Sequence, residues 1–91
     1  MPQPVRTHVF RRQRWKIRFD RLLPHAYGEC SHGERKIAID PNVGGLGRLD
    51  VLVHEAMHAC FPDLDEDEVD EYSWDIARFL WRLGYRGPDD D

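Results

Sequence analysis

The sequence predicts a small α+β domain: an antiparallel or mixed sheet of about three strands packs on one helix and is followed by a second, longer helix. Two observations lead to this prediction. Residues 14–20 alternate apolar and charged side chains with the period of two that a half-buried strand requires. Residues 49–83 instead repeat their apolar side chains every three or four positions, as amphipathic helices do. Strands therefore come first in the chain and helices follow.

The strand signal is strongest where Trp15, Ile17 and Phe19 alternate with charged residues. One face of this segment is apolar and the other is basic, which is typical of a half-buried antiparallel strand. A short strand piece is expected just before it, at residues 9–10. The next strand is predicted at residues 35–40, after a stretch whose prolines and glycines break any pattern.

Residues 40–47 predict a loop, because three glycines lie within its last four positions. The first helix is expected to follow at residues 49–60 and to end before Pro62, which cannot continue it. The second helix has clear start signals, since Asp65 can cap it and Glu68 can complete a capping box.

Gly84 is a natural stop, so the second helix should run from about residue 66 to residue 83. The apolar positions of this helix at helical spacing predict the face that packs on the rest of the domain. They are Val69, Tyr72, Ser73, Ile76, Leu80 and Leu83.

The 91 residues predict one domain over residues 1–86 and a polar tail over residues 87–91. No apolar run approaches the roughly 20 residues that span a membrane, and the first nine residues lack the apolar core of a signal peptide. Cys30 and Cys60 are too few for a disulfide framework. We therefore expect a cytoplasmic protein with reduced thiols and no membrane partner.

Cationic side chains crowd residues 6–21, where Asp20 is the only acid, although the net charge of the chain is −4. Such a segment can contact nucleic acid. Base-stacking motifs are missing from it, so the exposed face of a strand is the favoured interpretation, and a nucleic-acid partner is possible but not favoured.

The residues that carry chemistry are His54, Glu55 and His58, which form the pattern HExxH within the first helix. Histidines four residues apart lie on one face of a helix, so both imidazoles can bind a single ion. Glu55 projects about 100° to one side, where its carboxylate can take a proton from a water beside that ion. Apolar neighbours predict that this helix is largely buried, which argues against two merely solvated histidines.

This motif resembles the active-site helix of the zinc-dependent metallopeptidases, the zincins. The order of strands, loop, HExxH helix and second helix over about residues 15–85 is similar to that of minimal gluzincins and of small SprT-like phage-type and bacterial metallopeptidases. The resemblance implies a Zn²⁺ cofactor bound by His54 and His58, with Glu55 as general base. It also implies hydrolysis of peptide bonds in a peptide or unfolded protein substrate.

Gluzincins take a third ligand from a following helix in an ExxxD pattern, and Glu71 and Asp75 have that spacing here. The resemblance therefore implies that Glu71 is the third zinc ligand and that Asp75 hydrogen-bonds the back of a histidine ligand. Glu68 is the alternative metal ligand, because it lies closer to the apolar face. Cys30 is a further candidate, as a zinc-binding latency switch.

Zincins also bind extended substrates along an edge strand beside the active-site helix, and the resemblance points to residues 35–40 for that role. Two other functions stay open at this point. One is a zinc-stabilised binding or regulatory module without catalysis, which the small size favours. The other is a nucleic-acid-associated protease of SprT-like character, which the basic strand favours and the net negative charge disfavours.

Overall fold

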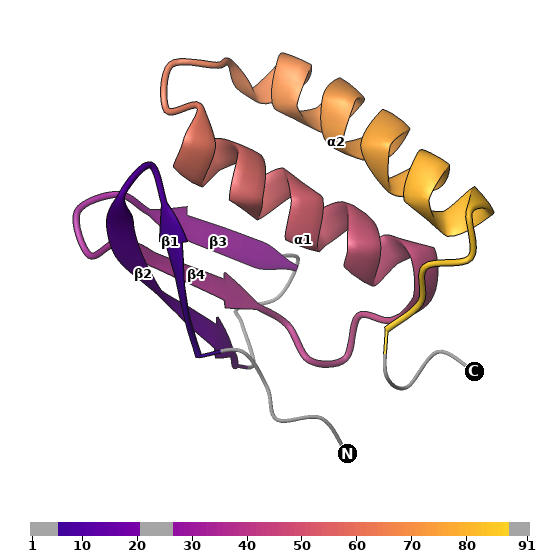
Figure 1. The fold of residues 1–91 in the computed structure, drawn as a ribbon, viewed down its shortest axis with the longest axis horizontal. Coiled ribbons are helices and arrows are strands. Elements are labelled where there is room, and N and C mark those ends of the chain that lie inside the picture. The colour runs from indigo at the N-terminus through magenta and orange to yellow at the C-terminus, as the bar shows by residue number, and fades with distance from the viewer. Residues whose placement is uncertain (1–5, 21–26, 88–91) are drawn as a thin grey trace.

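The computed structural model describes residues 6–20 and 27–87, which form one mixed sheet and two helices (Figure 1). The elements are β1 (Thr7–Phe10), β2 (Gln13–Phe19), β3 (Gly28–Ser31), β4 (Lys36–Ile39), α1 (Gly45–Cys60) and α2 (Glu66–Arg82). This confirms the predicted α+β class, with four strands in place of about three. No helix in the described part of the chain is long and apolar enough to cross a membrane.

The sheet has the strand order β1-β2-β4-β3. β2 pairs antiparallel with β1 and parallel with β4, and β3 pairs antiparallel with β4. β4 is therefore an interior strand, so the expectation that residues 35–40 form the edge beside the helix is wrong. The edge next to β4 is β3, a strand that the sequence does not predict, because Gly28–Ser31 has no alternating pattern and is held by its ladder to β4.

α1 lies between the sheet and α2, which packs on the side of α1 that faces away from the strands (Figure 1). This helix begins at Gly45, four residues before the predicted start, so the glycines expected in a loop form its first turn. Arg48 stabilises this start, since its guanidinium donates hydrogen bonds to the carbonyl oxygens of Val43 and Pro41, at 2.7 and 2.8 Å. Packing in the folded domain outweighs the low helix propensity of glycine here.

The core lies between the sheet and α1 and is built on Trp15, Ile37, Ile39 and Ala59. Ile17 pairs with Ile37 in the register of β2 and β4, so the apolar alternations of the two strands point to the same side. The basic positions of β2 between them are exposed, as the favoured interpretation predicts. They are Arg14, Lys16 and Arg18.

α2 packs on α1 through Val69, Ser73 and Ala77, all of which are fully buried. The Ser73 hydroxyl donates a hydrogen bond of 3.0 Å to the Asp50 carboxylate on α1, which satisfies a polar group in the interface. Part of the predicted packing face is wrong. Its largest members instead point to solvent: Tyr72, Ile76 and Leu83 are 40%, 42% and 60% exposed.

The start of α2 agrees with the prediction. The Asp65 carboxylate accepts a hydrogen bond of 2.9 Å from the backbone N–H of Glu68, and three acidic residues occupy the first turn. The Glu68 side chain does not return this bond but accepts one from the Tyr72 hydroxyl, at 3.4 Å. Asp65 is therefore the capping residue, and only half of the capping box forms.

We expect Asp65→Ala to lower the free energy of unfolding by about 0.5–2 kcal/mol, because the N–H of Glu68 loses its acceptor. Asp67→Ala is the matched control, since it removes an acid from the same turn without a capping bond and should cost clearly less than Asp65→Ala. Urea unfolding followed by circular dichroism measures both. Equal losses in the two variants would contradict the capping role.

Candidate metal centre

The two histidines of the motif lie one turn apart on the face of α1 that meets the start of α2. The Nε2 atoms of His54 and His58 are 3.2 Å apart, and the two rings meet edge to face. Their side chains are 17% and 21% exposed. Both nitrogens therefore point at one spot on the border between the interior and solvent.

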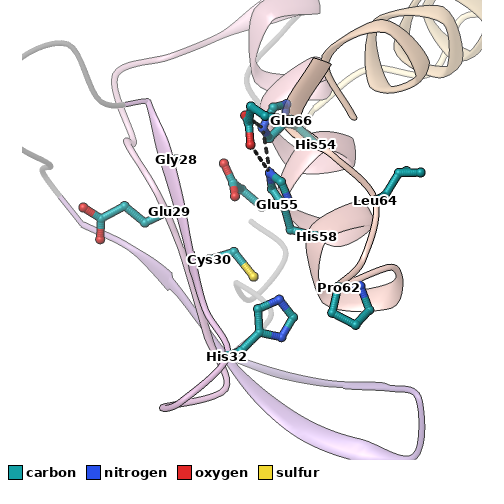
Figure 2. Close-up of a pocket in the computed structure, with 10 residues that line it drawn as sticks. All are labelled: Gly28, Glu29, Cys30, His32, His54, Glu55, His58, Pro62, Leu64 and Glu66. Atoms are coloured by element: carbon teal, nitrogen blue, oxygen red, sulfur yellow. Dashed lines mark hydrogen bonds and ion pairs between the residues drawn. The ribbon is translucent and has the colours of Figure 1, made fainter. Parts of the chain in front are cut away.

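The third side chain at this spot is Glu66, the first residue of α2 (Figure 2). One carboxylate oxygen lies 3.0 Å from His54 Nε2, and the other lies 3.0 Å from His58 Nε2. Among the described residues, His54, His58 and Glu66 are the histidine, cysteine and acidic side chains whose ligand atoms converge closely enough to hold one metal ion.

Behind His54, one turn further along α2, lies Asp70. Its carboxylate is 3.3 Å from His54 Nδ1, the ring nitrogen that points away from the cluster. A carboxylate in this place selects the tautomer with the proton on Nδ1 and leaves the lone pair of Nε2 directed at the cluster. Metal-binding histidines are commonly oriented in this way.

The donor set fits a zinc ion. Tetrahedral zinc with bonds of about 2.0–2.1 Å separates its ligand atoms by about 3.3 Å. The two histidine Nε2 atoms are 3.2 Å apart, and with one Glu66 oxygen they form a set whose atoms lie within 4.8 Å of one another. Two imidazole nitrogens and a carboxylate are also ligands that zinc prefers. When Nδ1 of His54 carries the proton, the lone pair of its Nε2 is free to bind a cation at the cluster.

The structure does not bring the predicted third ligand to this cluster. Glu71 and Asp75 are exposed and do not belong to the group around the histidines. The backbone N–H of Glu68 donates to the Asp65 cap, and its side chain accepts a hydrogen bond from the Tyr72 hydroxyl. The reason is the rotation of α2. At about 100° per residue, Glu71 lies some 140° around the helix from Glu66.

The residues that the sequence reasoning missed have a signal of their own. Glu66 and Asp70 repeat the ExxxD spacing that was assigned to Glu71 and Asp75, five residues earlier in the chain. They also share a helical face with the buried Ser73. The spacing alone cannot distinguish the two pairs, and the packing of α2 on α1 selects the first.

Glu55 lies beside the cluster, in a pocket of about 420 Å³ between α1 and β3. Its side chain is nearly buried, with the residue 6% exposed. Burial raises the pKa of the Glu55 carboxyl to about 7; His54 acts in the opposite direction, and Glu66 and Glu29 add to the increase. Figure 2 shows Glu55 between the histidines and the strand. The pocket is lined by Gly28, Glu29, Cys30, His32, His54, Glu55, His58, Pro62, Leu64 and Glu66.

Gly28 sets how closely β3 approaches α1. A Cβ atom at this position would lie 2.7 Å from a carboxylate oxygen of Glu55 and 2.7 Å from a methyl group of Val51, both far inside van der Waals contact. Only glycine therefore lets the backbone of the edge strand run directly past the Glu55 carboxylate.

The further candidate Cys30 and the remaining histidines of the chain do not belong to the group of converging ligand atoms among the described residues. Cys30 on β3 lines the pocket, where burial and then the charge of Glu55 raise the pKa of its thiol to about 11. His32 also lines the pocket but packs edge-on against Trp15, with ring centroids 5.3 Å apart. His8 packs in the same manner on Phe10. His25 lies outside the described residues.

No family model, curated protein or solved structure matches this chain.

We expect Gly28→Ala to displace the Glu55 carboxylate or to push β3 away from α1, because the added methyl group overlaps atoms of both Glu55 and Val51. Overpacking of this kind costs about 1–3 kcal/mol of folding free energy. Gly33→Ala is the matched control, since a Cβ atom there meets nothing within 4 Å. Thermal unfolding measures both, and a Gly28→Ala variant as stable as Gly33→Ala would contradict the close approach.

Proposed function

We propose that this protein is a zinc-dependent peptidase that holds its ion through His54, His58 and Glu66. The observation that carries the proposal is the convergence of these three donors beside a buried carboxylate in an open pocket. The HExxH motif supplies two of the ligands and that carboxylate. The Asp70 carboxylate contacts Nδ1 of His54 and orients that ring for metal binding through Nε2.

A zinc ion bound there would polarise a substrate carbonyl and make an adjacent water more acidic. Glu55 is the residue placed to accept the proton of the attacking water and to return it to the leaving amine. Its raised proton affinity in the metal-free protein follows from burial, and a neighbouring cation favours the anionic form that a base needs.

The substrate proposed is an extended peptide or an unfolded protein segment. In the sheet formed by residues 6–20 and 27–87, β3 is an edge strand that pairs with β4, and three of its residues line the same pocket as Glu55. An extended chain that pairs with the outer edge of β3 passes in front of the cluster, which is how strand addition brings a backbone carbonyl to a site. This replaces the role that the family resemblance gave to residues 35–40.

We further propose that the protein acts in the cytoplasm. Cys30 and Cys60 are both free thiols in the structure, which suits a reducing compartment.

The first test of the function is metal binding. We expect the purified protein to bind one equivalent of Zn²⁺, and we expect His54→Ala, His58→Ala and Glu66→Ala to weaken binding by orders of magnitude, because each removes a ligand. Glu71→Ala is the matched control and should bind zinc as the wild type does, since its side chain lies on the exposed side of α2. Competition with a chromophoric chelator measures the affinities.

Asp70→Asn should give an intermediate loss of about 10- to 100-fold in zinc affinity, the range typical of a partner behind a histidine ligand. A wild type that ignores zinc would end the proposal. Loss of zinc in Glu71→Ala with retention in Glu66→Ala would instead restore the ligand that the family resemblance implies.

The second test separates an enzyme from a zinc-stabilised binding module. Glu55→Gln keeps the shape of the side chain but removes the base, so peptidase activity on an unfolded protein should fall by about 10²-fold or more. Zinc affinity and melting temperature should stay near the wild-type values. A wild type that binds zinc but cleaves no unfolded protein would favour the non-catalytic module, in which Glu55→Gln changes nothing but stability.

A further inference from the structure

One side of α2 carries a stripe of large apolar residues that the domain leaves partly exposed. Tyr72, Ile76, Phe79 and Leu83 are 40%, 42%, 62% and 60% exposed. At about 100° per residue they fall within an arc of some 60° of the helix surface. We call these four residues the outer stripe.

The spacing within the outer stripe is that of a helix-pairing seam. Its members are separated by four, three and four residues, the alternation that brings apolar side chains to one line along two paired helices. Each stripe residue directly follows a charged residue, and at about 100° per residue the two of these that lie closest to the stripe are Asp75, before Ile76, and Arg82, before Leu83. Within the described residues neither takes part in an ion pair of the same chain.

The charges of α2 are divided by sign along its length. Every charged residue of the helix up to Asp75 is acidic, and every charged residue after it, through Arg86, is basic. Two copies of this helix side by side in parallel would place acid beside acid and base beside base. Placed antiparallel, the acidic half of each lies along the basic half of the other, and the helix dipoles also oppose favourably.

We propose that the outer stripe is the interface of a symmetric dimer in which α2 pairs antiparallel with α2 of a second copy of this chain. In this arrangement Ile76 lies beside Phe79 of the second copy, and Tyr72 lies beside Leu83. The same alignment brings Asp75 close to Arg82 of the second copy. The two-fold axis then generates an equivalent ion pair between Arg82 and Asp75 of the second copy.

The size of the stripe sets the strength of the dimer. Its exposed side chains amount to roughly 400 Å² per copy, the size of the largest apolar patch on a typical soluble protein, a patch that is often functional. A standard stable interface buries about 800 Å² per partner. The stripe is smaller than that, so the dimer we expect is weak and reversible.

The dimer leaves the candidate metal centres accessible. Glu66 and Asp70 lie on the inner side of α2, near its start, whereas the two-fold axis crosses the helix between Ile76 and Phe79. The two centres then lie at opposite ends of the helix pair, roughly 35 Å apart along the axis at 1.5 Å per residue. The dimer is thus independent of the proposed zinc chemistry.

Sedimentation velocity of the full chain over a range of about 1 µM to 1 mM tests the proposal. We expect the mass to rise from 10.8 kDa for the monomer to twice that value. Ile76→Ser and Phe79→Ser should each raise the dissociation constant at least tenfold while circular dichroism and melting temperature stay near wild type, because both side chains are exposed. Trp74→Ser is the matched control: Trp74 is as exposed as Ile76, at 41%, but faces another side of α2, so dimerisation should not change.

Charge reversal tests the antiparallel register. Asp75→Arg alone and Arg82→Asp alone should each weaken the dimer about tenfold or more, and the double variant should recover most of the loss. A wild type that stays monomeric at 1 mM would overturn the proposal and leave the stripe to a different protein. If Trp74→Ser weakened the dimer as much as Ile76→Ser does, the association would be non-specific and the proposed interface would be wrong. A double variant that dimerises no better than the single variants would exclude the antiparallel register.

Discussion

The rotation of α2 about its own axis is the constraint on which the candidate site depends. It is set where Val69, Ser73 and Ala77 pack on α1 and where the Ser73 hydroxyl meets the Asp50 carboxylate at 3.0 Å. A turn of the helix by one residue, about 100°, would bury a charged side chain and leave this hydroxyl without its partner. The packing therefore admits one rotation, and with it one acidic pair, Glu66 and Asp70, faces the histidines.

Local signals predicted much of the structure. The HExxH helix, the alternating strand with Trp15 on its buried face and the Asp65 cap all depend on residues a few positions apart, so their patterns are visible in the sequence. The rotation of α2 is different, because this helix has two apolar arcs. The larger residues lie on one of them, and periodicity weighted by size therefore chose a packing face that includes Tyr72 and Leu83. Glu71 and Asp75 came from the ExxxD spacing, which cannot tell them from Glu66 and Asp70, the pair that the packing turns towards the histidines.

β3 and the start of α1 were missed for a related physical reason. β3 is held by contacts with distant parts of the chain, since Gly28 pairs with Ile39 and lies against Glu55. Gly45 begins α1 at a φ of +60°, which glycine adopts without strain. A glycine marks a turn in local reasoning, yet Gly45 opens a helix and Gly28 permits backbone to approach a neighbouring element. Such a role becomes visible only when the neighbour is known.

The two glutamates at the cluster owe their proposed roles to opposite environments. Glu55 is 6% exposed and sits behind β3, whereas the Glu66 side chain is 64% exposed at the mouth of the pocket. An exposed carboxylate keeps its solvation until a cation replaces it, which suits a metal ligand contributed by a helix terminus. A buried carboxylate binds a proton more readily, which suits a group that must take up and return one. The packing of the metal-free protein therefore already gives Glu55 the buried environment that a proposed base needs, and leaves Glu66 in the solvated environment that suits a proposed metal ligand.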